Sequence, residues 1–528
     1  MPNTLANWLS YLESLHPKTI ALGLDRVAQV KERMALQPEF PVIVVGGTNG
    51  KGSVCAMLES ILHAAGYRVG CYTSPHLLHY NERVRIDKKQ ASDVELCASF
   101  KDIEQARKGL PPPCRGRAGE GVDSERDGAQ GFYPHPNLPP ARGKELSVES
   151  SEISLTYFEF GTLAAMQLFI SHKVDVAILE VGLGGRLDAV NVFDADCAVV
   201  TSVDIDHIDY LGDTREGIAF EKAGIFRKDR VAICADPNVP QAIRDHAQQI
   251  GAELWCIGKE FGFSLPSPAS GRGVGGEGRT VITLSRPAGH PHPQAGEGMA
   301  QWDFRSPSGE RHALPIPSLR GAFQLHNASA ALAALDALKD RLPVSMEAVR
   351  RGLVEVQLAG RFQFVPGRPQ LILDVAHNPH AARSLAQNLG SLPPAKTYAV
   401  FAMLKDKDMA GVVQALAPHI DVWLVAGIDA PRGANADELV QVLRNAGVSG
   451  EVTACASIAA ALHEASNRAG EDSGCDTLLR SSRLREQPPD TPSRTERLRA
   501  PCRECRIAAF GSFYTVAEVM QARALSVT

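Results

Sequence analysis

Residues 41–54 read PVIVVGGTNGKGSV, and this stretch decides the fold. The apolar run 41–45 predicts a buried strand, and the pattern SVCAMLESILHAAG from residue 53 onwards predicts a helix. Glycines between them let backbone N–H groups surround phosphates, and the start of a helix attracts negative charge. An ordinary glycine turn is the alternative, but the flanking strand and helix favour a nucleotide site. The loop residues are Gly47, Thr48, Asn49, Gly50, Lys51, Gly52 and Ser53.

Two loop side chains have chemistry suited to a nucleoside triphosphate. The ammonium of Lys51 would reach the terminal phosphates, and the hydroxyl of Ser53 would bind Mg²⁺. We therefore predict ATP binding here, although the loop alone does not indicate how the energy of ATP is used.

Outside the loop, strand-like and helix-like patterns alternate in two series. Continuous apolar runs at 174–182 and 196–203 predict further strands of a parallel sheet covered on both faces. A second series starts near residue 369, with strand-like runs at 370–378, 397–404, 422–427 and 507–513. We predict two α/β domains, residues 1–365 and 366–528, with a cleft between them.

Three segments, roughly 110–151, 266–300 and 473–505, do not fit this alternation. They are rich in Pro, Gly, Arg and Ser and contain too little apolar surface to fold alone. We expect them to be insertions that form surface loops, which a fold tolerates at a small entropic cost.

Composition narrows the class of protein. The chain has 528 residues, 44% of them hydrophobic, and a formal net charge of -5, so a nucleic-acid partner is not indicated. The first twenty residues lack a signal-peptide pattern, and no apolar run is long enough to cross a bilayer. We expect a cytoplasmic protein without a membrane partner, whose 11 cysteines are mostly reduced core thiols.

Nine motifs occur in an order that resembles the bifunctional dihydrofolate synthase/folylpolyglutamate synthase family, a group of the Mur ligase superfamily. They are GGTNGKGS, TSPHLLHYNERVRI, LTYFEFGTLAA, EVGLGGRLDAVN, SVDIDHIDYLG, FEKAGIFRKD, GRFQFV, LDVAHNPHAA and FGSFYTVAEV. The resemblance implies a Mur-ligase-like P-loop ATPase domain followed by a Rossmann-like domain. It also implies an ATP-dependent ligase that adds L-glutamate to dihydropteroate, giving dihydrofolate, and to the γ-carboxylate of reduced folates, through an acyl phosphate.

The resemblance implies two Mg²⁺ sites. Glu180 ends a buried strand, and a carboxylate at the carboxyl end of a parallel strand points into the ligand crevice. His207 by itself would be read as an ordinary loop histidine. Where the family commonly has an apolar residue, this chain has Asp204, an acid that would alter metal affinity. The implied metal-binding residues are Ser53, Ser74, Glu180, His207 and Lys222.

Lys222 matches a lysine that is carbamylated in that family. A carbamate converts a cation into an anion that is able to bridge or orient Mg²⁺. Without the resemblance, an exposed helix lysine would be the default interpretation.

Further ATP contacts implied by the resemblance are Asn327, Arg361 and Asp374. Arg361 lies at the predicted domain junction, so it would reach the phosphates only when the domains close. Asn327 has an alternative interpretation as a helix N-cap. The residues expected to take part in catalysis are Lys51, His207, Lys222 and Arg361.

The pterin-bearing substrate is expected near two segments that match the family. Phe158 would stack on a flat ring, and the acids would accept hydrogen bonds from ring N–H groups. For Tyr157 and Phe158 the alternative is helix packing, which we expect for one of the two. His377 and Asn378 are expected to face the cleft where glutamate enters. The expected substrate-binding residues are Thr156, Tyr157, Phe158, Glu159, Leu187, Asp188, Ala189 and His377, and residues 22–26 are expected to line the same pocket.

Two other functions compete with the folate ligase. One is a Mur-type ligase of peptidoglycan precursors, and the other is a nucleotide-binding homologue without catalysis. The segments SPHL and LTYFEFGTLAA favour the folate ligase, because they match the pterin-binding segments of that family. The expected partners are therefore dihydropteroate, reduced folates and L-glutamate, with the chain acting as a monomer.

Overall fold

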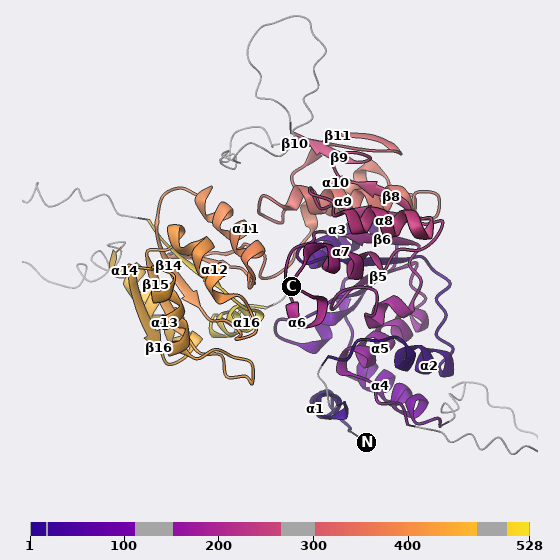
Figure 1. The fold of residues 1–528 in the computed structure, drawn as a ribbon, viewed down its shortest axis with the longest axis horizontal. Coiled ribbons are helices and arrows are strands. Elements are labelled where there is room, and N and C mark those ends of the chain that lie inside the picture. The colour runs from indigo at the N-terminus through magenta and orange to yellow at the C-terminus, as the bar shows by residue number, and fades with distance from the viewer. Residues whose placement is uncertain (1, 17–19, 111–151, 266–300, 473–503, 527–528) are drawn as a thin grey trace, which may run out of the picture.

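The computed structural model describes residues 2–16, 20–110, 152–265, 301–472 and 504–526. Nearly all of the three expected insertions lies outside these ranges. The described chain forms two lobes, the first built from the N-terminal two thirds of the sequence and the second from the rest (Figure 1). Within these ranges no helix is long and apolar enough to span a membrane.

The first lobe is built on an eight-stranded sheet with the order β4-β3-β2-β5-β1-β6-β7-β8. Its strands from β2 to β8 in this order are parallel, and β3 and β4 extend one edge as antiparallel strands. The strands are β1 Val42–Gly46, β2 Val69–Tyr72, β3 Val84–Ile86, β4 Lys89–Gln90, β5 Val176–Glu180, β6 Cys197–Val200, β7 Val231–Cys234 and β8 Glu253–Cys256.

Both faces of this sheet are covered because alternate residues of its strands enter two separate cores. In β1, Val42 and Val44 belong to one core, whereas Ile43 and Val45 belong to the other. Helices α3, α9 and α10 pack on the second core, and α1, α2, α4 and α5 on the first (Figure 1). The helices of this lobe are α1 Leu5–Leu15, α2 Asp25–Arg33, α3 Lys51–Ala64, η1 Tyr80–Arg83, α4 Asp93–Arg107, α5 Tyr157–Ser171, η2 Ala189–Val192, α6 Ile208–Leu211, α7 Arg215–Ala223, α8 Gln241–Ile250, α9 Gln324–Ala337 and α10 Met346–Glu355.

A small antiparallel sheet with the order β11-β10-β9 lies at one end of the same lobe (Figure 1). Trp302 and Phe304 of β10 are buried in the core that also contains α3 and α9. The strands are β9 Gly262–Ser264, β10 Gln301–Ser306 and β11 Gly309–Pro315.

The second lobe is a six-stranded sheet with the order β12-β13-β17-β14-β15-β16, parallel except for β12. Helices α11, α12 and α13 cover one face, and α14 and α16 cover the other. Its elements are β12 Gln363–Val365, β13 Gln370–Leu373, α11 Pro379–Gly390, β14 Lys396–Phe401, α12 Met409–Leu416, η3 Ala417–His419, β15 Val422–Ala426, α13 Ala436–Asn445, β16 Glu451–Cys455, α14 Ile458–Asp472, β17 Cys505–Phe510 and α16 Phe513–Ala522.

The carboxyl ends of parallel strands from the two sheets face a shared cavity. β1 and β5 end at Gly46 and Glu180, and β13 and β17 are followed by Asp374 and Gly511. Glu180 and the residues that follow β1, β13 and β17 line this cavity, which is where open α/β sheets bind ligands.

Candidate active site

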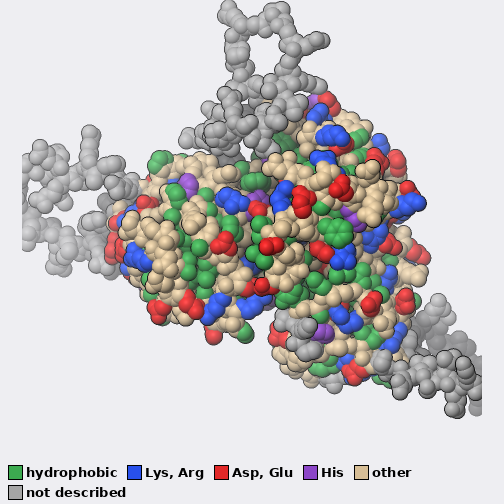
Figure 2. Space-filling view, viewed as in Figure 1, with side chains coloured by type: hydrophobic (Ala, Val, Ile, Leu, Met, Phe, Trp, Pro, Cys, Tyr) green, Lys and Arg blue, Asp and Glu red, His purple; other side chains and the backbone are tan. Residues whose placement is uncertain are grey.

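A cavity of about 1260 Å³ lies between the lobes and is lined by residues of both. Figure 2 shows a notch where the two lobes meet, at the lower edge of the view. Every residue expected to bind nucleotide, metal or substrate lines the cavity, with the exception of Tyr157. Of residues 22–26, Leu22 and Gly23 line it, together with Ile20 and Ala21, whereas residues 24–26 do not; Asn378 is also not among the lining residues, although His377 is.

The phosphate loop has a backbone that only glycine permits at two positions. Gly47 has φ +143°, and a Cβ there would lie 1.9 Å from the Oγ1 of Thr201. Gly50 has φ +90° at the start of α3, and a Cβ there would lie 2.6 Å from the Oδ1 of Asn327. Thr201, which follows β6, and Asn327 of α9 therefore fix the path of the loop, because a side chain at either glycine would collide with them.

Side chains just after β6 support the loop from behind. The hydroxyl of Thr201 donates to the carbonyl of Asn49 at 2.6 Å, and the N–H of Asn49 donates to the Oγ of Ser202 at 3.0 Å. The Nζ of Lys51 donates to the carbonyls of Gly47 and Thr48, at 2.9 and 3.3 Å. The ammonium of Lys51 therefore lies across the loop, where phosphate oxygens would replace these carbonyls.

Replacing Gly47 by alanine should destabilise the protein by about 1 to 3 kcal/mol and abolish tight ADP binding, because the new Cβ collides with Thr201. Gly66→Ala is the matched control, since Gly66 also has a positive φ (+92°) but has nothing within 4 Å of the added Cβ. Gly66→Ala should lose stability and keep its ADP affinity. Thermal unfolding and calorimetric titration with ADP measure the two effects, and equal ADP affinities in both variants would contradict the assignment of the loop.

Glu180 presents a buried carboxylate beside the loop. Its side chain is 5% exposed, and the N–H of Ser74 donates to Oε2 at 3.2 Å. Among the described residues nothing donates to its other oxygen, and burial raises the pKa of this carboxyl. A Cβ at Gly52 would lie 3.9 Å from both Glu180 Oε2 and Arg361 Nη2, so these two charges flank the loop.

A divalent cation fits at Glu180 with the help of phosphate oxygens. No group of three or more His, Cys, Asp or Glu side chains in the described ranges is arranged to hold a metal by itself. Mg²⁺ is usually bound by one or two carboxylates together with phosphates and water. The underused oxygen of Glu180 and the hydroxyls of Ser53 and Ser74, which line the same cavity, match that donor set.

Lys222 is buried in α7, so the interpretation as an exposed helix lysine is wrong. It is 4% exposed, and in the described part of the chain its ammonium has no hydrogen bond or ion pair. Burial, followed by the positive charge of Lys51, lowers the pKa of Lys222 to about 7. A large fraction of this lysine is therefore a neutral amine near neutral pH.

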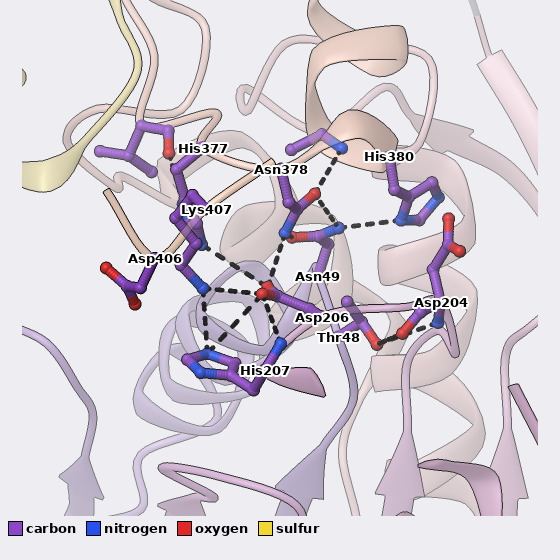
Figure 3. Close-up of polar contacts among 12 residues, drawn as sticks. Thr48, Asn49, Asp204, Asp206, His207, His377, Asn378, His380, Asp406 and Lys407 are labelled. Atoms are coloured by element: carbon purple, nitrogen blue, oxygen red, sulfur yellow. Dashed lines mark hydrogen bonds and ion pairs between the residues drawn. The ribbon is translucent and has the colours of Figure 1, made fainter. Parts of the chain in front are cut away.

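An ion pair connects the two lobes next to His207 (Figure 3). The Nζ of Lys407, in the loop between β14 and α12, lies 2.7 Å from Asp206 Oδ1 and 3.3 Å from His207 Nε2. Because an ammonium only donates, Nε2 of His207 is the acceptor in this contact. Burial lowers the pKa of His207 to about 4, so its imidazole is neutral, the form that binds metals.

Asparagine side chains make a second connection between the lobes (Figure 3). Asn49 and Asn378 exchange two amide hydrogen bonds of 3.2 Å each. Asn378 also donates to Asp206 Oδ2 at 2.9 Å and caps α11. Asp204 stands where the family commonly has an apolar residue. Its carboxylate accepts a hydrogen bond of 2.9 Å from Arg383 of the second lobe. That carboxylate therefore has a cation partner across the cleft.

The sequence patterns did not indicate Lys407, because it lies in the loop between β14 and α12 and not at the end of a strand. Lys407→Gln should lower the free energy of unfolding by about 3 kcal/mol, because Asp206, 11% exposed, loses its cation. Lys405→Gln is the matched control, since the ion pair of Lys405 with Glu438 is half exposed and contributes little. Similar unfolding midpoints for the two variants would show that the Asp206–Lys407 pair is unimportant.

The expected adenosine contacts come from both lobes. Asn327 is the fourth residue of α9, and Phe323 is the N-cap, so the N-cap interpretation of Asn327 is wrong. Asn327 donates instead to Gln324 and faces Gly50. Asp374 accepts from the N–H groups of Phe362 and Ala376, at 2.9 and 2.8 Å, and burial raises its pKa to about 6.

Phe158 and Asp188 supply the cavity with an aromatic surface and a carboxyl group. Phe158 packs against Gly182, where a Cβ would lie 2.8 Å from the ring, and its centroid is 5.7 Å from that of Tyr72. Asp188 accepts from the N–H of Leu183 at 2.8 Å, and burial raises its pKa to about 7. These features suit a flat heterocycle with polar edges.

Thr156 and Glu159 form the capping box of α5, and Glu159 also accepts from Arg26 at 2.9 Å. Their polar atoms are therefore partly engaged in holding the start of this helix.

Comparison with known proteins decides the family. The Mur ligase middle domain matches residues 145–335, and the Mur ligase glutamate ligase domain matches residues 360–482. The chain is 42% identical over 443 residues to the dihydrofolate synthase/folylpolyglutamate synthase of Escherichia coli strain K12, covering 84% of this chain and 86% of that protein. The chain belongs to the dihydrofolate synthase/folylpolyglutamate synthase family.

Solved structures of this family agree with the fold. E. coli FolC in complex with DHPP and ADP is 37% identical, covers 99% of both chains and has a TM-score of 0.73. The Yersinia pestis enzyme complexed with AMPPNP and Mn is 36% identical, covers 99% of this chain and 100% of that chain, and has a TM-score of 0.71. The predicted family, α/β fold class and ATP-dependent ligase class are confirmed, and ATP with a divalent cation is the cofactor set of the family.

Proposed function

We propose that this chain uses ATP to join L-glutamate to dihydropteroate and to the γ-carboxylate of reduced folates. The observation that carries the proposal is that one cavity contains a phosphate loop, a buried carboxylate for a cation and an aromatic pocket with a carboxyl group. Its relatives are named for both activities, and one solved relative of 37% identity contains Mn, AMPPNP and L-glutamate.

The residues divide the work of phosphoryl transfer. The N–H groups of the loop and Lys51 would hold the triphosphate, and Glu180 with Ser53 and Ser74 would hold the cation, which would supply Lewis-acid charge. Arg361 reaches the phosphates from the lobe junction. The substrate carboxylate attacks the γ-phosphorus as the bond to ADP breaks, giving an acyl phosphate. The amine of glutamate then attacks the acyl carbon, losing a proton and releasing phosphate.

No protein nucleophile takes part in this scheme. Cys55 and Cys71, which lie near Glu180, are fully buried, and burial raises the pKa of both thiols. We propose that catalysis rests on positioning and on electrostatic stabilisation of the transferring phosphoryl group.

Glutamate-dependent release of ADP, measured with dihydropteroate and tetrahydrofolate in turn, tests the proposal. Release with both substrates supports the two activities. Release only with a UDP-muramoyl substrate would identify a peptidoglycan ligase instead. Nucleotide binding without release on any of the three would identify a non-catalytic homologue.

We further propose that residues 1–365 and 366–528 are two domains that close on the substrates, in a monomeric cytoplasmic protein. The contacts of Asn49 with Asn378 and of Asp206 with Lys407 support a closed arrangement held by polar contacts.

A further inference from the structure

Arg83 is a cation in the cavity wall that the proposed mechanism does not use. Its guanidinium carbon lies 5.3 Å from the ring centroid of Tyr80 and 5.4 Å from that of Tyr157. The rings of Tyr80 and Tyr157 pack edge to face, with their centroids 5.7 Å apart. Cation–π contacts with two rings therefore hold the guanidinium in place.

Tyr157 thereby has a position that differs from the sequence expectation. It does not line the cavity, but it supports Arg83, which does. Of the two neighbouring aromatic residues, Phe158 lines the cavity and Tyr157 acts through Arg83.

His76 accompanies Arg83 on the same wall. The Nε–H of Arg83 donates to His76 Nδ1 at 2.9 Å. A guanidinium has no acceptor, so Nδ1 of the imidazole is unprotonated and the ring proton is on Nε2. The pair therefore offers only donors to a ligand.

Neighbouring carboxylates do not neutralise Arg83. Glu82 accepts from the N–H groups of Leu77, Leu78 and His79 at 2.6 to 2.7 Å, and Glu159 is paired with Arg26. Within the described ranges Arg83 has no ion pair, and its hydrogen bond to His76 is the single one found for its side chain. A guanidinium that is held between two rings and has unpaired N–H groups is suited to bind a carboxylate.

The Arg83–His76 pair is separate from the reacting end of the cavity. Neither side chain makes a hydrogen bond to the phosphate loop, Glu180 or Lys222. His76 follows Ser74 by two residues, whereas Tyr157 precedes Phe158. Arg83, His76, Ser74 and Phe158 all line the same cavity, so the pair shares its wall with the proposed cation site and the aromatic pocket.

We propose that Arg83 and His76 bind a substrate carboxylate other than the one that is phosphorylated, the α-carboxylate of a folate that already carries glutamate. This inference rests on the proposed function. Dihydropteroate has a single carboxylate, which must react, so the pair would distinguish glutamylated substrates from dihydropteroate.

The test is the kinetics of Arg83→Gln with tetrahydrofolate and dihydropteroate. We expect KM for tetrahydrofolate to rise about tenfold or more relative to KM for dihydropteroate, because charge-assisted hydrogen bonds are lost. The effect should be in KM rather than kcat, since a non-reacting carboxylate is bound equally in the ground and transition states. Arg83→Lys should restore part of the difference.

Two further variants keep the test decisive. Tyr157→Leu removes one supporting ring and should shift the same ratio in the same direction, even if Arg83→Gln folds poorly. Arg350→Gln, an exposed arginine of α10, is the matched control and should leave the ratio unchanged. Equal changes of KM for both substrates would overturn the inference while leaving the proposed function intact. Failure of the unmodified protein to release ADP with either substrate would instead refute the function.

Discussion

Lys51→Ala should reduce glutamate-dependent ADP release by about 10²- to 10³-fold, the usual cost of removing one group that stabilises developing charge in a closed site. The ammonium lies across the phosphate loop, 2.9 Å from the carbonyl of Gly47, with no carboxylate in hydrogen-bond contact within the described chain. Its charge is therefore available to phosphate oxygens. Because it would contact the phosphates both before and during transfer, KM for ATP should rise as kcat falls.

Lys101→Ala is the control for this experiment, since Lys101 is an exposed residue of α4 outside the cavity. Its rates should match those of the unmodified protein. Normal ADP release by Lys51→Ala would remove the basis for placing the triphosphate on this loop.

Removal of carbon dioxide should lower activity by about 10- to 100-fold, and bicarbonate should restore it, if Lys222 is carbamylated as its family resemblance implies. The neutral Nζ attacks the carbon of CO₂, an N–C bond forms and a proton leaves to solvent, which creates an anion. Burial and a pKa of about 7 favour this reaction, because an ordinary lysine would be protonated and unreactive. Acidification below that pKa protonates the amine, so bicarbonate should restore less activity at lower pH.

Lys222→Ala should be as impaired as the CO₂-free protein and should not respond to bicarbonate. Lys228→Ala, an exposed lysine six residues away, should behave like the unmodified protein in both buffers. Mass measurement of active protein provides a second readout. An active enzyme with an unmodified Lys222 would refute the carbamate.

Local sequence patterns were sufficient to predict the phosphate loop and the parallel strands on either side of the cavity. A glycine-rich loop between an apolar run and a helix has few structural solutions, and continuous apolar strands need cover on both faces. The position of Glu180 also followed from the local sequence, because the last residue of a parallel strand lies at the edge of the sheet where ligands bind. The burial of Lys222 did not, since α7 also contains exposed residues, such as Glu216 and Phe220, and its sequence does not tell which of its polar residues is covered.

Contacts between distant segments decided the remaining features. Asp206 and Lys407 are 201 residues apart, so no local pattern relates them, and their ion pair exists only because the two sheets face each other. Similarly, the sequence Tyr157-Phe158 does not indicate which of the two rings faces the cavity. Packing against Tyr80 and Arg83 turns Tyr157 away, whereas the space at Gly182 accepts Phe158.

The sequence by itself determined the loop that suits a triphosphate, the α/β class and the family, because these depend on residue order over short stretches. The tertiary structure decided which side chains meet across the cleft and which of them are buried. Burial and opposing charges set the pKa values of Lys222 and His207, and both depend on neighbours that are brought close only by folding.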